Sequence, residues 1–154
     1  PLTGLLNYQG TVDKITDSLS FGEGRFALMF IDLDDFKTVN DTLGHMAGDE
    51  LLRQTARAFQ AVVREGDLVG RVGGDEFVVF MRRIRSVSEV EACAQRLCDV
   101  VQRIGVSERL GVGTSCSIGI ALAPEDGTGY GALVKKADRL AYQAKASGKN
   151  RYCM

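Results

Sequence analysis

The pattern of apolar and polar residues divides the chain into helices and strands. Where apolar positions recur three to four residues apart, the spacing predicts amphipathic helices. The predicted helices cover residues 7–20, 38–43, 47–64, 86–104 and 130–146. Residues 26–33 are almost continuously apolar, which is typical of a strand that is buried on both faces. Further strands are predicted over residues 114–123 and, as a short final segment, 150–153.

Residues 71–76 are a polar stretch between two apolar runs, at 68–69 and 77–81. This pattern predicts a strand, a tight turn and a second strand. The two glycines of the turn permit positive φ and let a ligand approach the backbone closely. The two acids that follow them repel each other unless a cation lies nearby, and a divalent metal ion is the natural candidate. An ordinary hairpin with a solvated glutamate is the alternative.

The order of elements predicts an α+β fold with a central, mainly antiparallel sheet flanked by helices. In this arrangement the hairpin pairs antiparallel with the strand at residues 26–33. Acids follow that strand abruptly, and Asp32 and Asp34 are expected on one face with Leu33 turned away. Asp32 would then converge with Asp75 and Glu76 of the hairpin. Carboxylate oxygens from two elements suit Mg²⁺, which usually completes its shell with water and substrate phosphates. A triphosphate is therefore the expected partner.

Composition and charge narrow the class of protein. With 154 residues, 45% hydrophobic and 25% charged, residues 1–154 are expected to form one globular domain. The 19 basic and 20 acidic residues give no electrostatic case for binding a nucleic-acid polymer. Four cysteines without C-x-x-C spacing predict a reducing, cytoplasmic compartment. A chain that begins Pro1-Leu2-Thr3 indicates a domain excised from a longer multidomain protein, so a sensor segment or an inner-membrane anchor could lie upstream.

Several spaced motifs carry a resemblance to a known family. They are Leu2-Thr3-Gly4-Leu5-Leu6-Asn7, residues 31–41 (IDLDDFKTVND), residues 44–49 (GHMAGD), residues 71–77 (RVGGDEF), residues 117–121 (SIGIA), Ala137-Asp138 and residues 142–150 (YQAKASGKN). Over nearly the whole chain the sequence resembles the GGDEF domain, the catalytic domain of diguanylate cyclases. Several ordered motifs are far more specific than one short motif. The resemblance implies a fold similar to the nucleotidyl cyclase or ferredoxin-like palm, with the Gly-Gly-Asp-Glu-Phe motif on a β-hairpin.

The resemblance also implies a reaction. Two GTP molecules would be condensed to cyclic di-GMP with release of pyrophosphate, across an antiparallel homodimer that holds one GTP in each subunit. By this analogy Asp32, the carbonyl of Leu33, Asp75 and Glu76 hold Mg²⁺ or Mn²⁺. Asp75 and Glu76 are the expected catalytic residues, and Asp75 helps to deprotonate the attacking hydroxyl.

The expected GTP-binding residues lie in several of the matched motifs. Asn40 and Asp49 would recognise guanine, because an aspartate accepts from N1–H and the 2-amino group and finds no match on adenine. The remaining expected contacts to GTP are Phe36, Lys37, Gly73, Gly74, Lys145 and Lys149. Lys149 stands where family members usually carry arginine, so it keeps the charge without the bidentate fork.

Arg64-x-x-Asp67 has the spacing of the family's product-inhibition site, relative to Gly73. The expectation is that Arg64 and Asp67 bind cyclic di-GMP, and the alternative is a salt bridge at a helix end. His45 is expected to make a structural hydrogen bond, and Asn7 and Asp138 are also expected to be structural.

Two functions of different classes stay open at this point. The first is an active diguanylate cyclase, which the presence of Asp32, Asp75 and Glu76 favours. The second is a non-catalytic module that binds GTP or cyclic di-GMP and regulates a partner domain. A cyclase that also accepts ATP is a remote third, against which Asp49 argues.

Overall fold

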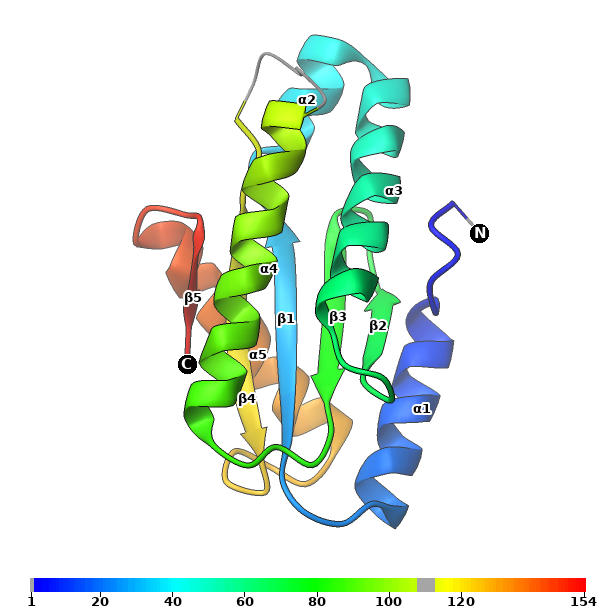
Figure 1. Cartoon of the computed structure of the whole chain (residues 1–154), viewed down its shortest axis with the longest axis vertical. Helices are drawn as coiled ribbons and strands as arrows, with labels where there is room; N and C mark the ends of the chain where they lie inside the picture. The colour runs from blue at the N-terminus through cyan, green and yellow to red at the C-terminus, as the bar shows by residue number, and fades with distance from the viewer. Residues whose placement is uncertain (1, 108–112) are drawn as a thin grey trace.

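The fold is a sheet covered by helices on both faces. The computed structural model describes residues 2–107 and 113–154. Within these residues the strands form one five-stranded sheet in the order β2-β3-β1-β4-β5, with only the β4–β5 pair parallel. The strands are β1 (Phe26–Leu33), β2 (Leu68–Arg71), β3 (Glu76–Met81), β4 (Cys116–Ala123) and β5 (Arg151–Cys153). The predicted α+β fold with a mainly antiparallel sheet is confirmed (Figure 1).

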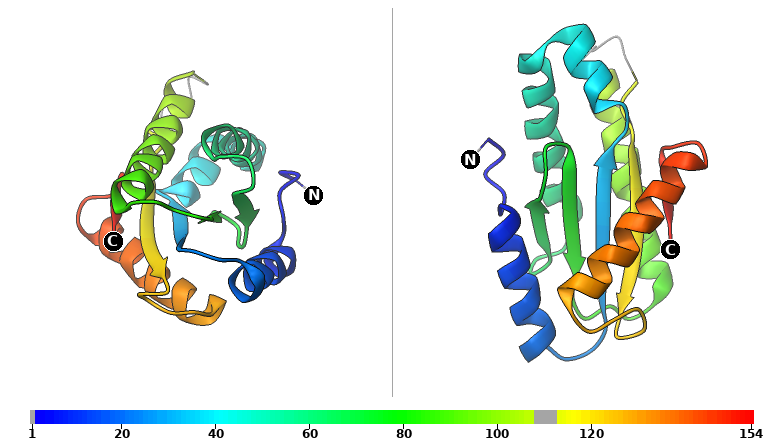
Figure 2. Two further views of the ribbon diagram at one scale, coloured as in Figure 1. Left: turned by 60° about the horizontal axis from the view of Figure 1, so that its bottom comes forward. Right: turned by 180° about the vertical axis from the view of Figure 1, so that it is seen from behind.

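Helices form the outer two layers. They are α1 (Tyr8–Phe21), α2 (Phe36–Leu43), α3 (His45–Val62), α4 (Val87–Ser107) and α5 (Tyr130–Ala146). Residues of α3 and α4 share one core with the sheet, and residues of α1 and α5 share the other (Figure 2). The sequence placed α5 within its observed bounds, whereas α3 begins two residues before the predicted start and β4 two residues after it.

The strand β1 separates these two cores. Its odd-numbered residues, such as Met29 and Ile31, pack on the side of α3 and α4, and its even-numbered residues, such as Leu28 and Phe30, pack toward α1 and α5. This alternation follows from the period of two in a strand. Burial on both faces explains why the segment reads as one continuous apolar run.

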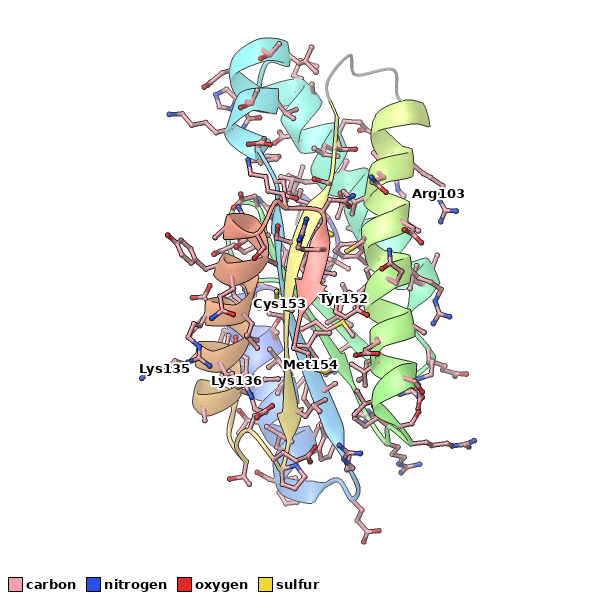
Figure 3. All side chains as sticks on the ribbon, turned by 90° about the vertical axis from the view of Figure 1, so that its left-hand side faces the viewer. Arg103, Lys135, Lys136, Tyr152, Cys153 and Met154 are labelled. Atoms are coloured by element: carbon pink, nitrogen blue, oxygen red, sulfur yellow. The ribbon has the colours of Figure 1, made fainter. Side chains whose placement is uncertain are left out.

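At the far edge of the sheet, β5 lies between α5 and α4. Figure 3 shows Tyr152 and Cys153 at this edge, with α5 on one side and α4 on the other. The strand pairs in parallel with β4 through Ser117 opposite Arg151 and Ile118 opposite Tyr152. The turn between α5 and β5 is thereby held close to the end of β1.

The topology sends different loops to the two ends of the sheet. The carboxyl end of β1 and the tip of the β2–β3 hairpin lie at the same end, and the α3–β2 connection lies at the other (Figure 1). None of the helices in the described ranges combines the length and the apolarity needed to cross a membrane.

Candidate active site

Backbone pairing brings the predicted acids together at the end of β1. Asp32 stands directly opposite Glu76 in the antiparallel pair of β1 and β3. The N–H of Leu33 donates to the carbonyl oxygen of Asp75 at 3.1 Å, and the N–H of Val72 donates to the carbonyl oxygen of Glu76 at 2.9 Å. The first bond fixes the hairpin tip against β1, and the second closes the hairpin itself. The acids of the two elements therefore meet as the hairpin prediction required.

The cluster is short of positive charge. Burial is the largest cause that raises the pKa of Asp32 to about 6, and the charges of Glu76, Asp75 and Asp138 raise it further. Lys145 opposes this shift. Burial, followed by the charge of Asp75, also raises the pKa of Glu76. Carboxylates that repel one another in a partly buried place are expected to attract a cation.

The donor set fits a divalent cation such as Mg²⁺, because it consists of hard carboxylate and carbonyl oxygens. Across residues 2–107 and 113–154, no group of three or more His, Cys, Asp or Glu side chains is placed so that it could hold a metal ion. The acids would thus supply part of a coordination shell. Substrate phosphates and water are the usual source of the remaining ligands for Mg²⁺.

The glycine pair does not take up the positive φ that glycine permits. The close approach of a ligand to the backbone of Gly73 and Gly74 stays a prediction. A Cβ added at Gly73 would lie 2.1 Å from Oε1 of Glu76, whereas a Cβ at Gly74 would meet nothing within 4 Å. Gly73 therefore leaves room for the Glu76 carboxylate. Gly74 is held through its carbonyl oxygen, to which Nε and Nη2 of Arg71 donate at 3.1 and 2.9 Å.

The expected guanine-reading residues lie close together on α2 and α3. A Cβ at Gly48 would lie 1.8 Å from Oδ1 of Asn40 and 3.3 Å from Cζ of Phe36. The Asn40 amide thus occupies the space left by Gly48, the neighbour of the half-buried Asp49. The left-handed backbone of Asp35, with φ of 56°, makes the turn from β1 into α2 that allows this approach.

The expected phosphate-binding lysines differ in their surroundings. Lys145 lies near enough to Asp32 to lower the pKa of that carboxyl. Lys149 donates from Nζ to Oδ1 of Asp35 at 2.7 Å, and this bond is the main cause of its raised pKa. Lys37 is exposed on α2. A phosphate that binds Lys149 would therefore compete with Asp35.

Asp34, two residues from Asp32, is a structural anchor. The residue is 4% exposed. It accepts from Oγ of Ser115 and of Ser117 at 2.6 Å each, and from the N–H of Asn150 at 3.0 Å. Ser117 is the register partner of Asp32, so Asp34 lies on the same face as Asp32, as expected. Asp34 ties the end of β1 to β4 and to the turn that carries Lys149.

The sequence missed one contributor to the cluster and misjudged another residue. Asp138 was expected to be structural, yet its charge acts on both Asp32 and Glu76. Its spacing of seven residues from Lys145 on α5 was the available signal, since that spacing returns a side chain to the same face. His45 is exposed, and the described residues include no hydrogen bond from its side chain. Asn7 caps α1 as expected, accepting from the N–H of Gly10 at 2.8 Å.

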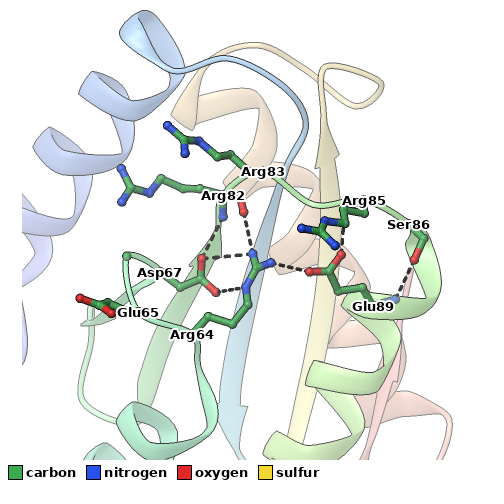
Figure 4. A pocket seen from close by; sticks show the side chains of 9 residues that line it. Arg64, Glu65, Asp67, Arg82, Arg83, Arg85, Ser86 and Glu89 are labelled. Atoms are coloured by element: carbon green, nitrogen blue, oxygen red, sulfur yellow. Dashed lines mark hydrogen bonds and ion pairs between the residues drawn. The ribbon is translucent and has the colours of Figure 1, made fainter.

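Arg64 and Asp67 are not part of this cluster. They line a hollow of about 930 Å³ near the α3–β2 connection, together with residues of the β3–α4 loop and Glu89 (Figure 4). Nε of Arg64 donates to Oδ2 of Asp67 at 3.0 Å, so the salt bridge that was the alternative prediction does form. Arg64 also pairs with Glu89, which no sequence pattern indicated.

Comparisons with known proteins agree with the motif assignment. The family described as "Diguanylate cyclase, GGDEF domain" matches residues 1–151. The chain is 38% identical over 157 residues to cyclic di-GMP phosphodiesterase PdeR of Escherichia coli (strain K12), covering 99% of this chain and 23% of that protein. It is 38% identical over 152 residues to diguanylate cyclase TpbB of Pseudomonas aeruginosa (strain UCBPP-PA14), covering 96% of this chain and 35% of that protein.

A solved structure supports the fold as well. The crystal structure of the GGDEF domain of DgcB from Caulobacter crescentus in complex with c-di-GMP matches with a TM-score of 0.87 at 27% identity, covering 99% of this chain and 92% of that chain. This chain spans about a quarter of PdeR and about a third of TpbB. Members of this family use divalent metal ions, in keeping with the donor set at the hairpin. The chain belongs to the GGDEF domain family, whose description names diguanylate cyclase as its activity.

Proposed function

We propose that this chain is the catalytic domain of a cytoplasmic diguanylate cyclase. It condenses two GTP molecules into cyclic di-GMP and releases pyrophosphate. The observation that carries the proposal is the meeting of Asp32, Asp75 and Glu76 at one end of the sheet, with too little positive charge nearby. Residues 1–154 act as a single domain of a longer protein, downstream of a sensor domain.

Each of the two condensation steps follows the same chemistry. The 3′-oxygen of one GTP attacks the α-phosphorus of the other, a new P–O bond forms, and the bond from that phosphorus to the leaving pyrophosphate breaks. A bound Mg²⁺ or Mn²⁺, held by Asp32, the Leu33 carbonyl, Asp75 and Glu76, would supply Lewis acidity that makes the hydroxyl more acidic. Asp75 accepts the proton from the hydroxyl.

The other proposed contacts bind and orient GTP. Lys37, Lys145 and Lys149 bind its phosphates, and the backbone at Gly73 and Gly74 approaches them. Asn40 and Asp49 recognise guanine, and Phe36 lies with Asn40 beside Gly48. Because ATP would leave the Asp49 carboxylate without donors, ATP is rejected. Two such sites must face each other, so the active form is a homodimer.

The hollow at Arg64 is proposed as the product-inhibition site. Cyclic di-GMP carries phosphates that suit arginine, and DgcB, a relative with the same fold, has been crystallised with c-di-GMP. In this proposal Arg64 and Asp67 contact the product, and Arg64→Ala relieves inhibition. Unchanged inhibition in Arg64→Ala would argue against this part of the proposal.

The competing function is a non-catalytic module that binds GTP or cyclic di-GMP. One observation supports this alternative. PdeR, which matches nearly the whole of this chain, is named as a phosphodiesterase. In such a protein the GGDEF domain could serve another domain. Asp32 on β1 and the two hairpin acids favour the enzyme.

The test is a product assay at high protein concentration. Nucleotide-free protein is incubated with GTP and Mg²⁺, and the products are separated by chromatography. Asp75→Asn serves as the blank, and Asp99→Asn on α4 makes the same chemical change away from the cluster. Cyclic di-GMP from wild type and Asp99→Asn, but not from Asp75→Asn, is the expected result. GTP binding without any turnover in an enforced dimer would instead identify a regulatory module.

A further inference from the structure

The hollow at Arg64 contains its own acids. Its lining has four arginines against three carboxylates, namely Arg64, Arg82, Arg83 and Arg85 against Glu65, Asp67 and Glu89. An anion that enters this hollow therefore meets side chains of its own sign. How those acids are held decides which of them the anion can replace.

The guanidinium group of Arg64 uses four of its five N–H groups in hydrogen bonds within the hollow. Nε and Nη2 donate to the two carboxylate oxygens of Asp67 at 3.0 and 3.3 Å, and Nη2 also donates to the carbonyl oxygen of Arg82 at 2.6 Å. Nη1 donates to Oε1 of Glu89 (Figure 4). A phosphate recognises arginine through its N–H groups, ideally two at a time. A phosphate can bind two N–H groups of Arg64 at once only if one of these partners gives way.

The two acids that hold Arg64 are anchored differently. The Asp67 side chain is 3% exposed, and its Oδ1 also accepts from the N–H of Arg82 at 3.1 Å. The Glu89 side chain is 27% exposed and reaches Arg64 with a single oxygen. Asp67 is thus part of the framework of the hollow. Glu89 is the partner that can leave.

Glu89 also has a second partner that stays in place when it leaves. Its Oε2 accepts from the N–H of Arg85 at 2.9 Å, at the start of α4. An acid in the first turn of a helix is stabilised there by the helix dipole. A Glu89 carboxylate released from Arg64 would therefore keep a hydrogen bond and a favourable field. This lowers the cost of exchanging it for a ligand.

We propose that Glu89 is a built-in competitor for the anionic ligand of this hollow. Its carboxylate occupies the position on Nη1 of Arg64 that a ligand phosphate takes, and a cyclic dinucleotide binds by displacing it. Glu89 thereby sets the ligand concentration at which the hollow fills. The inference rests on the proposed product-inhibition site, and it adds the residue that tunes its affinity.

The test is calorimetric titration of cyclic di-GMP into the purified chain and its variants. Glu89→Gln removes the charge but keeps an oxygen that can accept from the Arg85 N–H. Glu89→Asp keeps the charge but shortens the side chain, so that it reaches Arg64 less well. Both are expected to bind about two- to fivefold more tightly than wild type, the range that loss of a partly exposed ion pair provides.

The matched control is Glu65→Gln. Among the described residues Glu65 lines the same hollow without pairing with Arg64, so its replacement removes one negative charge and no competing contact. It is expected to change the affinity less than Glu89→Gln does. Thermal unfolding without ligand establishes that each variant is folded, and Arg64→Ala defines the binding that belongs to this hollow.

Three results would overturn the inference. Equal shifts for Glu65→Gln and Glu89→Gln, with none for Glu89→Asp, would show that only overall charge matters. Weaker binding in both Glu89 variants would make Glu89 a ligand contact or a structural cap. In either case binding that Arg64→Ala abolishes would leave the product-inhibition site standing. Binding that is absent from wild type, or that survives in Arg64→Ala, would overturn that site and the role of Glu89 together.

Discussion

Two charged regions lie at opposite ends of the sheet, and the pKa values of their carboxyl groups are shifted in opposite directions. At the hairpin, burial and neighbouring acids raise the pKa of Asp32 to about 6 and also raise the pKa of Glu76. At the Arg64 hollow, the N–H of Arg85, and to a lesser degree Arg64, lower the pKa of Glu89. Carboxylates at the first end face one another, whereas carboxylates at the second end face arginine.

The difference separates two ways of preparing a binding site. A cluster of unpaired carboxylates is costly to the folded protein, and it is retained where a cation and a charged substrate will complete it. A hollow whose charges are already paired is stable when empty, so a ligand must exchange with an existing partner. We expect the first region to gain stability from loss of an acid and the second region to lose it.

Asp32→Asn is the sharpest way to test this contrast. Under the proposed function, loss of an oxygen that would hold the metal is expected to lower cyclase activity by about 100-fold or more. In metal-free protein the same change is expected to stabilise the fold by about 1 kcal/mol near pH 8, because an uncompensated, partly buried charge is removed. Product formation measures the first effect, and urea unfolding in EDTA measures the second.

The pH dependence of this gain has a definite sign. The folded protein holds the Asp32 proton more tightly than the unfolded chain does, since its pKa is raised from 3.8 to about 6. The cost of the charge is absent below the lower value, grows as the pH rises between the two values and is complete above the higher one. The two proteins should therefore be equally stable near pH 3.5. A variant that is less stable than wild type at every pH would refute the view of an uncompensated cluster.

Asp67→Asn makes the same chemical change in the other region, with the opposite expected result. The Asp67 side chain is 3% exposed and binds both the guanidinium of Arg64 and the N–H of Arg82. Loss of its charge is expected to destabilise the fold by about 2 kcal/mol, because the bonds to the guanidinium are charge-assisted. Urea unfolding measures this effect. Glu65→Gln at the exposed rim should change stability by less than about 0.5 kcal/mol.

The fold and the meeting of the acids could largely be predicted from the sequence, because apolar residues recur with the period of each helix or strand. The apolar run of β1 and the helical spacing of α5 gave the observed bounds of both elements, because burial leaves a regular pattern in the sequence. The meeting of Asp32 with the hairpin acids followed from one further assumption, that the hairpin pairs with β1. Antiparallel pairing then fixes which residues face each other.

The remaining features depend on packing between distant segments. Glu89 lies 25 residues from Arg64, and the two meet only because α4 begins beside the α3–β2 connection. No local spacing reports such a contact. The sequence suggested that Gly73 is a glycine because glycine permits positive φ. Its φ is not positive, and the Glu76 side chain fills the space where a Cβ would lie. A pattern can show that glycine is used, but the neighbour that requires it appears only in three dimensions.

The smallest expected effect concerns the geometry of the acid cluster rather than its charge. In Gly73→Ala the new Cβ would lie 2.1 Å from Oε1 of Glu76, so the end of the Glu76 side chain must move, while the backbone needs no change of φ. We expect stability to change by less than about 1 kcal/mol, and cyclase activity to fall by about fivefold through misplacement of one oxygen.

Gly74→Ala is the matched control, because a Cβ there meets nothing within 4 Å. Measurement of product formation over a range of Mg²⁺ concentrations distinguishes the causes, since displacement of an oxygen that is proposed to hold the metal should raise the Mg²⁺ requirement of Gly73→Ala alone. Equal losses in the two variants would instead indicate that the substrate needs both backbone positions free of side chains, and the contrast between the two ends of the sheet would then rest on charge alone.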